Sequence, residues 1–585
     1  MKPSRRDILR GAGVAGMAAG TTALPGCEEL ASGGAHEHPA PSDEGGITVE
    51  TIAEAEKLQG VSFTASERAL MLEELEEKVQ TFANLRAIET PNDLAPASIF
   101  NPRLPRKRIG SQKNTLAIGG TYDAPIPTGD GRARAIAHAS VAQQGVWLRA
   151  GAITSAELTE IYLARIAEHD GALNAFVTPI PEIARTQAAR ADKDFADGRD
   201  RGPLHGIPYG LKDLADVKNV RTTWGAAPYK ERVSEDDADI VRRLYRAGAV
   251  LLGKTTLGAI ARGDRWFGGR TNNPWNPKEG SSGSSAGSAA ATAAGLCSFA
   301  IGTETLGSLI SPSERCGVAT VRPTFGRISR AGLMALAWSL DKVGPLCRSV
   351  EDTALVLSVL NGYDADDPAT ARVGFSYDGK ATLSDMTVGY VPAWFDDEGD
   401  ETDRAALAAL KGLGVAVKEI TWPDVDFASL RQIVAVESAA AFADLTLTDR
   451  DDELTRQGEN AWPNTWRAAR FVSAVDYVQM DRLRRKLMAD VGALFDDVDA
   501  IIGPNFAGGA LLATNMTGHP QLAFRAGFTQ RTARGGDDEN SAGETFRAPR
   551  NVSLWGDLFQ EGKLIALGAA LEETLRAHAE TPPGF

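Results

Sequence analysis

Apolar and polar positions follow two alternating patterns over most of the chain. Between residues 155 and 169, four apolar side chains recur at the spacing of one helix face. Short apolar runs at residues 248–253 and 298–302 are bounded by Gly-rich turns, which is typical of buried strands. A further helix is indicated at residues 349–360. Because strands and helices alternate, we predict an α/β fold, with a central mixed β-sheet covered by helices on both faces.

A separate helical segment is expected over residues 48–108, as an N-terminal extension. Thr64 and Glu67 have the spacing of a capping box, in which each side chain binds the backbone of the other residue. Apolar side chains then recur at helical spacing, at Leu72, Leu75, Val79 and Phe82. This pattern predicts a helix with one face buried against the main domain. Pro- and Asn-rich chain without a clear period follows, from residue 90 to 108.

The first 26 residues have the order of an export signal. Arg5 and Arg6 precede a mild apolar run at residues 11–24, and small residues end it. The paired arginines resemble the twin-arginine type, which implies an exported protein, periplasmic or secreted. The run ends in a segment similar to a lipoprotein cleavage box, in which Cys27 would carry a lipid and attach the protein to a membrane. Ordinary cleavage nearby, without a lipid, is the alternative. A cytosolic tail with a chance arginine pair is the alternative.

Composition narrows the class of protein. The chain has 585 residues, 43% hydrophobic and 24% charged, which are proportions of a globular protein. The net charge is −15 and no basic stripe appears, which argues against nucleic acid as a partner. Residues 27–47 are polar and rich in Gly, Pro and Ser, and are expected to form a flexible linker. Its histidines, His36 and His38, have no further ligands nearby, so no metal site is predicted.

Two short motifs match the sequence patterns of well-known sites, but the residues around them do not favour the local structure that those sites require. Residues Gly248–Thr255 have the letters of a phosphate-binding loop, yet the four linking residues, Ala-Val-Leu-Leu, favour a buried strand. Residues Gly283–Gly287 match the nucleophile elbow of α/β-hydrolases, with Asp499 and His519 downstream. An elbow serine must follow a strand, and residues 276–281 do not have the composition of one. We therefore set both interpretations aside.

Three separated features together suggest serine chemistry. Lys212 lies in an apolar, turn-bounded run, Ser284 lies in a Ser/Gly loop that leads into an Ala-rich segment, and Ser308 follows a strand end and a Gly turn. A serine hydroxyl is a weak nucleophile and needs a base within hydrogen-bond reach. A lysine can be that base when it is neutral, which requires burial to lower its pKa from about 10.4.

These three motifs, in this order, resemble those of the amidase signature family. That family carries a lysine, then a Gly-Gly-Ser-Ser-Gly-Gly loop, then a Gly-Gly-Ser nucleophile, and the spacing from Ser284 to Ser308 also matches. The resemblance is strong over residues 130–365 and looser towards the C-terminus. It implies the amidase signature fold for residues 109–585, as the catalytic domain, and hydrolysis of a carbon–nitrogen amide bond.

The resemblance also implies a role for each residue. Ser308 would be the nucleophile, Ser284 the proton relay and Lys212 the general base, with a cis peptide bond at Gly283–Ser284. Ser285 is expected in substrate binding. Alternatively, either loop serine could serve only as a helix N-cap. The substrate would be a small-molecule amide, and no cofactor is expected.

Other activities are compatible with the same residues. An esterase or carbamate hydrolase would use the same machinery. The transamidating subunit of a tRNA-dependent amidotransferase is a relative, although an export signal argues against it. A catalytically silent binding protein on this fold is an alternative of a different class, and the intact set of lysine and two serines argues against it.

The turn that carries the nucleophile is also expected to stabilise an anion. Backbone N–H groups of Thr305, Leu306, Gly307 and Ser308 can be directed at one point and would form an oxyanion hole. Gly307 would supply the backbone angle that such a turn requires.

The chain departs from the family pattern around this turn. The common form is Gly-Thr-Asp-x-Gly-Gly-Ser-x-Arg, and here Glu304, Leu306 and Ile310 replace the Asp, the second Gly and the Arg. In the family the Asp and Arg would pair and brace the loop. We therefore expect that brace to be missing and Glu304 to need another partner or to take a different position.

Several further residues suggest local structure. Cys297 is expected to be a buried free thiol, whereas a Cys316–Cys347 bridge is compatible with export but not deducible. The polar, Gly-rich residues 530–547 predict a surface loop or hairpin tip. Three aromatic residues are candidates for lining a substrate pocket, with plain core as the alternative: Trp266, Phe267 and Trp338.

Overall fold

The structure is a computed structural model. It describes residues 46–585 except 89, 106, 108, 111, 425, 426 and 534–543. The predicted export signal, Cys27 and most of the predicted linker therefore lie outside the described residues. Among the helices that are described, none has the length and apolar character needed to cross a membrane.

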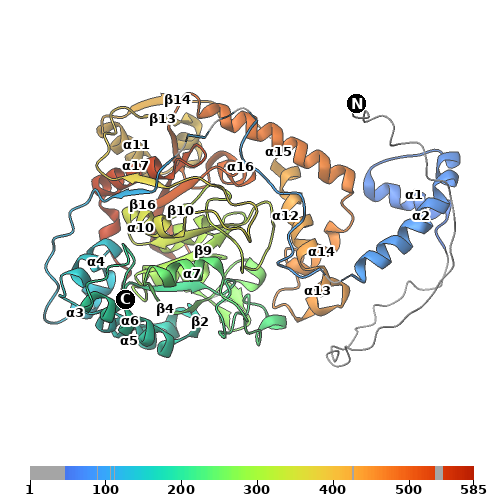
Figure 1. The fold of residues 1–585 in the computed structure, drawn as a ribbon. Helices are drawn as coiled ribbons and strands as arrows, with labels where there is room; N and C mark the ends of the chain where they lie inside the picture. Colours follow the sequence, from blue (N-terminus) through green and yellow to red (C-terminus); the bar gives the residue numbers. More distant parts are fainter. Residues whose placement is uncertain are drawn as a thin grey trace, which may run out of the picture. The chain divides into compact units, whose positions relative to one another are not determined.

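The described residues form a large mixed sheet of 11 strands (Figure 1). Its strand order is β14-β13-β15-β17-β16-β10-β11-β9-β3-β4-β2. The strands are β2 (Phe176–Pro179), β3 (Pro208–Lys212), β4 (Val250–Thr255), β9 (Phe299–Glu304), β10 (Ala319–Arg322), β11 (Lys342–Cys347), β13 (Thr387–Tyr390), β14 (Ala416–Glu419), β15 (Ala500–Pro504), β16 (Gln521–Thr532) and β17 (Thr545–Gly556). Small two-stranded sheets pair β1 (Thr115–Ala117) with β12 (Ser376–Asp378), β5 (Arg265–Trp266) with β6 (Gly269–Arg270), and β7 (Asn272–Asn273) with β8 (Asn276–Gly280).

Strand β3 lies deep in this sheet. It pairs in parallel with β4 on one side and with β9 on the other, and β9 pairs antiparallel with β11. Every residue of β3, β4 and β11 is buried. A sheet covered on both faces favours apolar or small residues along its strands, which explains the apolar runs in the sequence. Three buried lysines are the exceptions in these strands: Lys212, Lys254 and Lys342. The predicted α/β class is confirmed.

Helices surround the sheet (Figure 1). They are α3 (Arg132–His138), α4 (Val141–Arg149), α5 (Ser155–Leu173), α6 (Pro181–Ala196), α7 (Asp239–Arg246), α8 (Ala286–Ala293), α9 (Ile310–Cys316), α10 (Val350–Leu360), α11 (Glu401–Gly412), α12 (Phe427–Ala441), α13 (Ala443–Leu447), α14 (Trp462–Ala469), α15 (Ala474–Leu494), α16 (Ala510–Thr517) and α17 (Glu561–Leu575). Those from α12 to α15 lie to one side of the sheet and pack mainly on one another and on α16 (Figure 1). The helices expected at residues 155–169 and 349–360 correspond to α5 and α10. Helix α8 is buried along its whole length, which its Ala-rich sequence permits.

The N-terminal extension begins with α1 (Val49–Gln59) and α2 (Ala65–Arg86). The predicted capping box is present, because the backbone N–H of Glu67 donates to Thr64 Oγ1 at 3.3 Å and that of Thr64 to Glu67 Oε2 at 2.6 Å. The expectation of a buried face is wrong, since α2 contains no buried residue and Phe82 is 48% exposed. The apolar spacing was enough to predict the helix, but it did not reveal whether another element covers that face.

The C-terminal part explains one predicted insert. Strands β16 and β17 pair from Gln521–Trp555 to Thr532–Thr545, so both ends of the 530–547 segment belong to a hairpin, as expected. The tip lies outside the described residues. The three cysteines of the described chain are all buried and free, so the suggested Cys316–Cys347 bridge is not formed. Burial raises the pKa of the Cys297 thiol to about 11.

Candidate active site

Lys212 ends strand β3 and is buried, with 1% of its surface exposed. Its Nζ donates to three hydroxyl groups, those of Ser284 at 2.8 Å, Ser285 at 3.1 Å and Thr303 at 2.9 Å. The structure therefore brings together Lys212 and the two loop serines selected from the sequence. Thr303 is a partner that the sequence analysis missed, and its place beside Glu304 in the Gly-Thr motif was the available signal.

The position of Lys212 changes its acid–base behaviour. Burial lowers the pKa of the amine to about 7 from a usual 10.5, although the nearby carboxylates of Asp341 and Glu304 oppose the change. No carboxylate is among its hydrogen-bond partners in the described structure. A substantial fraction of the amine is therefore neutral near pH 7 and can accept a proton.

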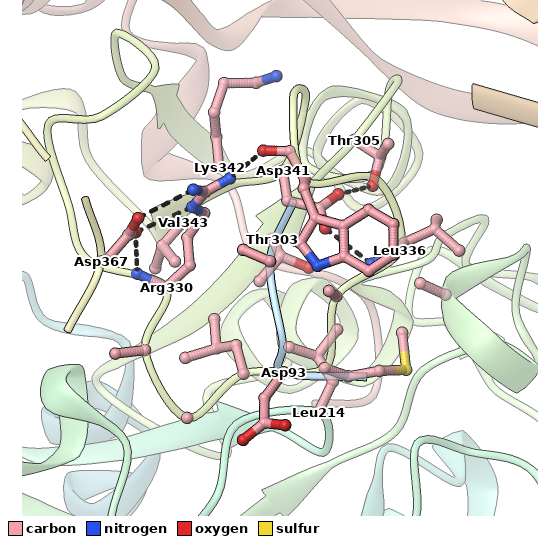
Figure 2. Close-up of a pocket in the computed structure, with 18 of the residues that line it drawn as sticks. Asp93, Leu214, Thr303, Thr305, Arg330, Leu336, Asp341, Lys342, Val343 and Asp367 are labelled. Carbon is pink, nitrogen blue, oxygen red and sulfur yellow. Dashed lines mark hydrogen bonds and ion pairs between the residues drawn. The ribbon is translucent and has the colours of Figure 1, made fainter. Parts of the chain in front are cut away.

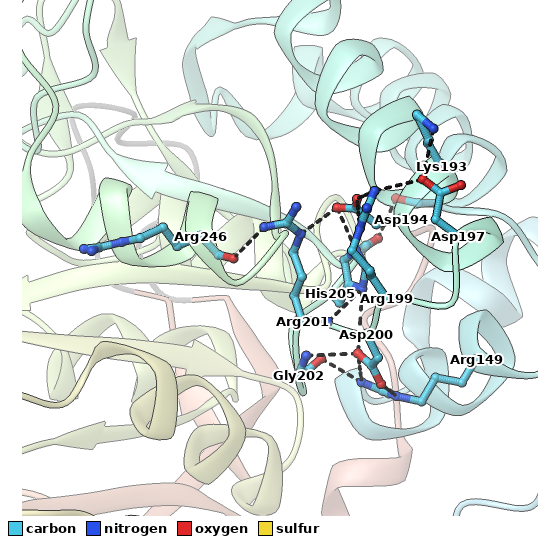
Figure 3. Close-up of polar contacts among 12 residues, drawn as sticks. Arg149, Lys193, Asp194, Asp197, Arg199, Asp200, Arg201, Gly202, His205 and Arg246 are labelled. Atoms are coloured by element: carbon cyan, nitrogen blue, oxygen red, sulfur yellow. Dashed lines mark hydrogen bonds and ion pairs between the residues drawn. The ribbon is translucent and has the colours of Figure 1, made fainter.

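The turn before β3 is held by a polar cluster at the end of α6 (Figure 3). Asp194 accepts from Arg199 at 2.7 Å and from Arg201 at 2.6 Å. The buried His205 ring accepts from the backbone N–H of Arg201 at 3.2 Å and stacks on Phe195. These contacts fix the chain a few residues upstream of Lys212.

The loop that carries the two serines has an unusual backbone. The Gly283–Ser284 peptide bond is cis, as the family resemblance implied. A Cβ at residue 283 would lie 1.9 Å from the carbonyl oxygen of Gly263, so only glycine fits there. Ser285 is the residue before α8, but its side chain makes no capping hydrogen bond. The plain N-cap interpretation therefore does not explain Ser285.

Ser285 instead joins two elements of the site. Its hydroxyl donates to the carbonyl oxygen of Thr303 at 3.1 Å and accepts from the N–H of Thr303 at 3.2 Å. Its own backbone N–H donates to the carbonyl oxygen of Ser308 at 3.1 Å. The serine loop, the end of β9 and the Ser308 turn are thus tied to one another. Substrate contact by Ser285 stays a prediction.

Ser308 lies in the turn between β9 and α9 and is 9% exposed. Gly307 has φ +89, a conformation that favours glycine. Within the described chain, the backbone N–H groups of Leu306, Gly307 and Ser308 have no hydrogen-bond acceptor. Thr305 directs its hydroxyl to Asp341 at 2.5 Å. Donors without partners beside a serine hydroxyl are what a developing oxyanion requires.

Glu304 has another set of partners in place of the family's brace, as one of the two expectations required. Its carboxylate accepts from the N–H groups of Leu309 at 2.8 Å and Ile310 at 3.1 Å. Arg322 Nη1 lies 3.0 Å away and Asn515 Nδ2 donates at 2.8 Å. Burial raises the pKa of Glu304, but these partners together hold it below its ordinary value. The cation comes from β10 rather than from position 310, and no local motif signals this.

The two rejected motifs have structural explanations. Lys254 of the phosphate-loop match lies in β4, fully buried, with its Nζ 3.3 Å from Asp213 and donating to Thr222 Oγ1 at 2.7 Å. Asp499 pairs with Lys563 at 3.1 Å, and the ring of His519 bonds to Thr517. The expectation that no strand precedes the serine loop is wrong, because residues Asn276–Gly280 form β8, which pairs with β7 outside the main sheet. The elbow interpretation still fails, since neither Asp499 nor His519 contacts the serine loop through any described polar interaction. In the described part of the chain, no group of His, Cys, Asp and Glu side chains could hold a metal ion.

A cavity adjoins the site (Figure 2). Thr303 and Thr305 belong to its lining, so the cavity lies directly beside the Ser308 turn. Apolar side chains that include Leu214, Leu336 and Val343 line much of the rest. Among the candidate pocket aromatics, Trp338 lines this cavity. The other two, Trp266 and Phe267, are not part of its lining and pack edge to face on one another, with ring centres 4.9 Å apart.

Comparison with known proteins agrees with this geometry. The family model described as Amidase matches residues 157–529. The chain belongs to the Amidase family. As a member it is an enzyme that acts on carbon–nitrogen amide bonds. The matched range contains Lys212, Ser284 and Ser308 and leaves the N-terminal extension outside.

Relatives with different names share this similarity. A glutamyl-tRNA(Gln) amidotransferase subunit of Methylococcus capsulatus is 31% identical over 504 residues, covering 76% of this chain and 99% of that protein. The native peptide amidase of Stenotrophomonas maltophilia is 30% identical with a TM-score of 0.65, covering 76% of this chain and 98% of that one. A 6-aminohexanoate cyclic dimer hydrolase is 25% identical with a TM-score of 0.63, covering 76% and 99%.

Proposed function

We propose that this protein hydrolyses an amide bond of a small molecule through an acyl-enzyme on Ser308. Ser284 relays the proton and Lys212 is the general base. One observation carries the proposal, which is the buried Nζ of Lys212 at 2.8 Å from the hydroxyl of Ser284, on a loop bonded to the Ser308 turn. A pKa of about 7 provides the neutral amine that this role needs.

The reaction proceeds in two halves. The Ser308 hydroxyl attacks the amide carbonyl, its proton passes to Ser284, and the proton of Ser284 passes to Lys212. The N–H groups of residues 306–308 stabilise the oxyanion. As the tetrahedral intermediate collapses, the proton returns through Ser284 to the leaving nitrogen, the carbon–nitrogen bond breaks and the amine departs. Water then attacks the ester by the same relay, releasing the acid and restoring Ser308.

Labelling with a fluorophosphonate tests the nucleophile. We expect wild type to be labelled once, Ser308→Ala not to be labelled, and Lys212→Ala to keep its fold but lose amide hydrolysis. Ser311→Ala is the matched control, because its hydroxyl lies nearby on α9 and contacts only Ser282 among the described side chains. Equal labelling of Ser308→Ala and wild type would contradict the proposal.

A second candidate is a transamidating enzyme component, which the similarity to the amidotransferase of Methylococcus capsulatus favours. The net charge of −15 without a basic stripe, and the proposed export by residues 1–26, favour the stand-alone hydrolase. We would offer the isolated protein glutamine, peptide amides, aryl amides and matched esters and measure ammonia, amine or alcohol release. Transamidation would be favoured if glutamine were the one substrate hydrolysed and if its hydrolysis required added partner proteins.

A reporter fused to residues 1–47 tests the proposed export.

A further inference from the structure

One wall of the cavity beside the candidate active site comes from the N-terminal extension. Asp93 and Ala95 line the cavity together with Thr303 and Thr305 of the active site. Figure 2 shows Asp93 on the blue segment that runs across the cavity. The match to the family begins only at residue 157, so this wall lies outside the part of the chain that the family model describes.

The side chain of Asn92 binds this part of the N-terminal extension to the main domain. Its side-chain amide donates to the carbonyl oxygens of Ala335 at 2.9 Å and Ala441 at 3.2 Å. Its carbonyl oxygen accepts from the N–H of Ala335 at 2.7 Å. Ala335 itself lines the cavity. One half-buried side chain therefore uses both donor and acceptor to hold the extension against the segment at Ala335, which fixes its position at the cavity.

The charges that line the cavity leave a negative rim. Arg330 pairs with Asp367 at 2.9 Å, and the carboxylate of Asp341 is taken by Thr305 and by backbone N–H groups. Lys342 is buried and donates to a backbone carbonyl. Two further lining carboxylates, Asp93 and Asp366, are exposed and have no ion-pair partner among the described residues.

We propose that residues 91–95 are a specificity-determining wall of the substrate pocket, in which Asn92 fixes the wall and Asp93 favours substrates carrying a positive charge away from the scissile amide. This inference rests on the proposed function. The mixture of apolar lining and a negative rim fits an acyl group with an apolar stretch and a cationic end. An anionic end would meet two carboxylates without a compensating cation.

The size of the effect follows from the exposure of Asp93. A single carboxylate near a cation at a solvated rim changes a rate by about three- to fivefold, and salt weakens it. We therefore expect Asp93→Asn to lower the preference for a cationic over a neutral reagent by about that factor at low salt. Asn92→Ala should reduce discrimination among all reagents, because the wall is no longer held at one distance.

The test uses three fluorophosphonates that differ only in a terminal trimethylammonium, hydroxyl or carboxylate group. Second-order labelling rates are measured for wild type, Asp93→Asn and Asn92→Ala. Asp130→Asn and Asn101→Ala are matched controls, since Asp130 is exposed with no described partner and Asn101 bonds only to Arg103. We expect wild type to react fastest with the cationic reagent and both controls to behave like wild type.

The outcomes separate this inference from the proposed function. If no reagent labels wild type, the nucleophile assignment has failed, and the wall has no substrate pocket to shape. If wild type is labelled but shows no cationic preference, or if Asp93→Asn keeps the wild-type ratio, the charge role is overturned. Unchanged discrimination in Asn92→Ala overturns the anchoring role.

Discussion

At the scale of single residues, the proposed chemistry depends on one amine without a carboxylate partner. Lys212 has a lowered pKa because it is buried, and it meets hydroxyl groups instead of acids. A base must be unprotonated to work, and the unprotonated form dominates above the pKa. We therefore expect kcat/KM to rise about tenfold per pH unit below about 7 and to level off above it.

The pH profile is measured with one neutral amide between pH 5 and 9, and the fluorophosphonate labelling rate should follow the same curve. Lys212→Ala provides the control, because its residual rate should lose this dependence near pH 7. A wild-type rate that stays flat from pH 5 to 8 would exclude Lys212 as the titrating base.

At the scale of elements, the candidate site lies where the ends of two strands and two glycine-containing turns come together. Strands β3 and β9 are neighbours and deliver Lys212 and Thr303 to the same end of the sheet. The loop before α8 approaches them so closely that residue 283 cannot carry a side chain. The geometry of three separate segments is thus fixed by backbone contacts and not by side-chain size.

Gly283→Ala tests this arrangement. The added methyl group would meet the carbonyl oxygen of Gly263, so the loop must shift, and a shift of about 1 Å can cost about 100-fold in rate. Labelling of Ser308 reports the loss. Gly171→Ala is the matched control, because Gly171 lies in α5 with open space around it and should gain about 0.5–1 kcal/mol of stability without losing activity. Normal labelling of Gly283→Ala would show that the loop tolerates displacement.

At the scale of the whole molecule, the N-terminal extension has two parts, and we expect their removal to affect stability and selectivity differently. Helices α1 and α2 form a hairpin in which Arg68 pairs with Glu56 at 2.7 Å, and α2 buries no residue. A chain that begins at residue 89 should therefore keep its labelling rate and change its melting temperature by no more than about 2 °C. A chain that begins at residue 97 also lacks Asn92 and Asp93 and should lose the selectivity between charged reagents. Loss of labelling in the longer chain would contradict this division.

Much of the fold and site could be predicted from the sequence, and the exceptions share a physical cause. The alternation of apolar runs and helices predicted the α/β sheet, and the resemblance to the amidase signature family implied that Lys212 and Ser284 would meet. Periodicity identifies the apolar face of a helix but not whether another element packs on it. This is why the predicted burial of one face of α2 was wrong. The partners of Glu304 and of Asn92 depend on strand order and on long-range docking, which short sequence patterns do not encode.

The brace around Glu304 constrains how this chain can diverge from other family members. Arg322 and the N–H groups at 309 and 310 already occupy the buried carboxylate, and Ile310 is itself fully buried. An arginine introduced at position 310 would bring a further cation to a buried carboxylate that Arg322 already pairs with, and removal of Arg322 would take away the cation in contact with it. Either change alone is therefore expected to destabilise the turn. Segments exchanged between members must carry positions 304, 310 and 322 as one inherited unit.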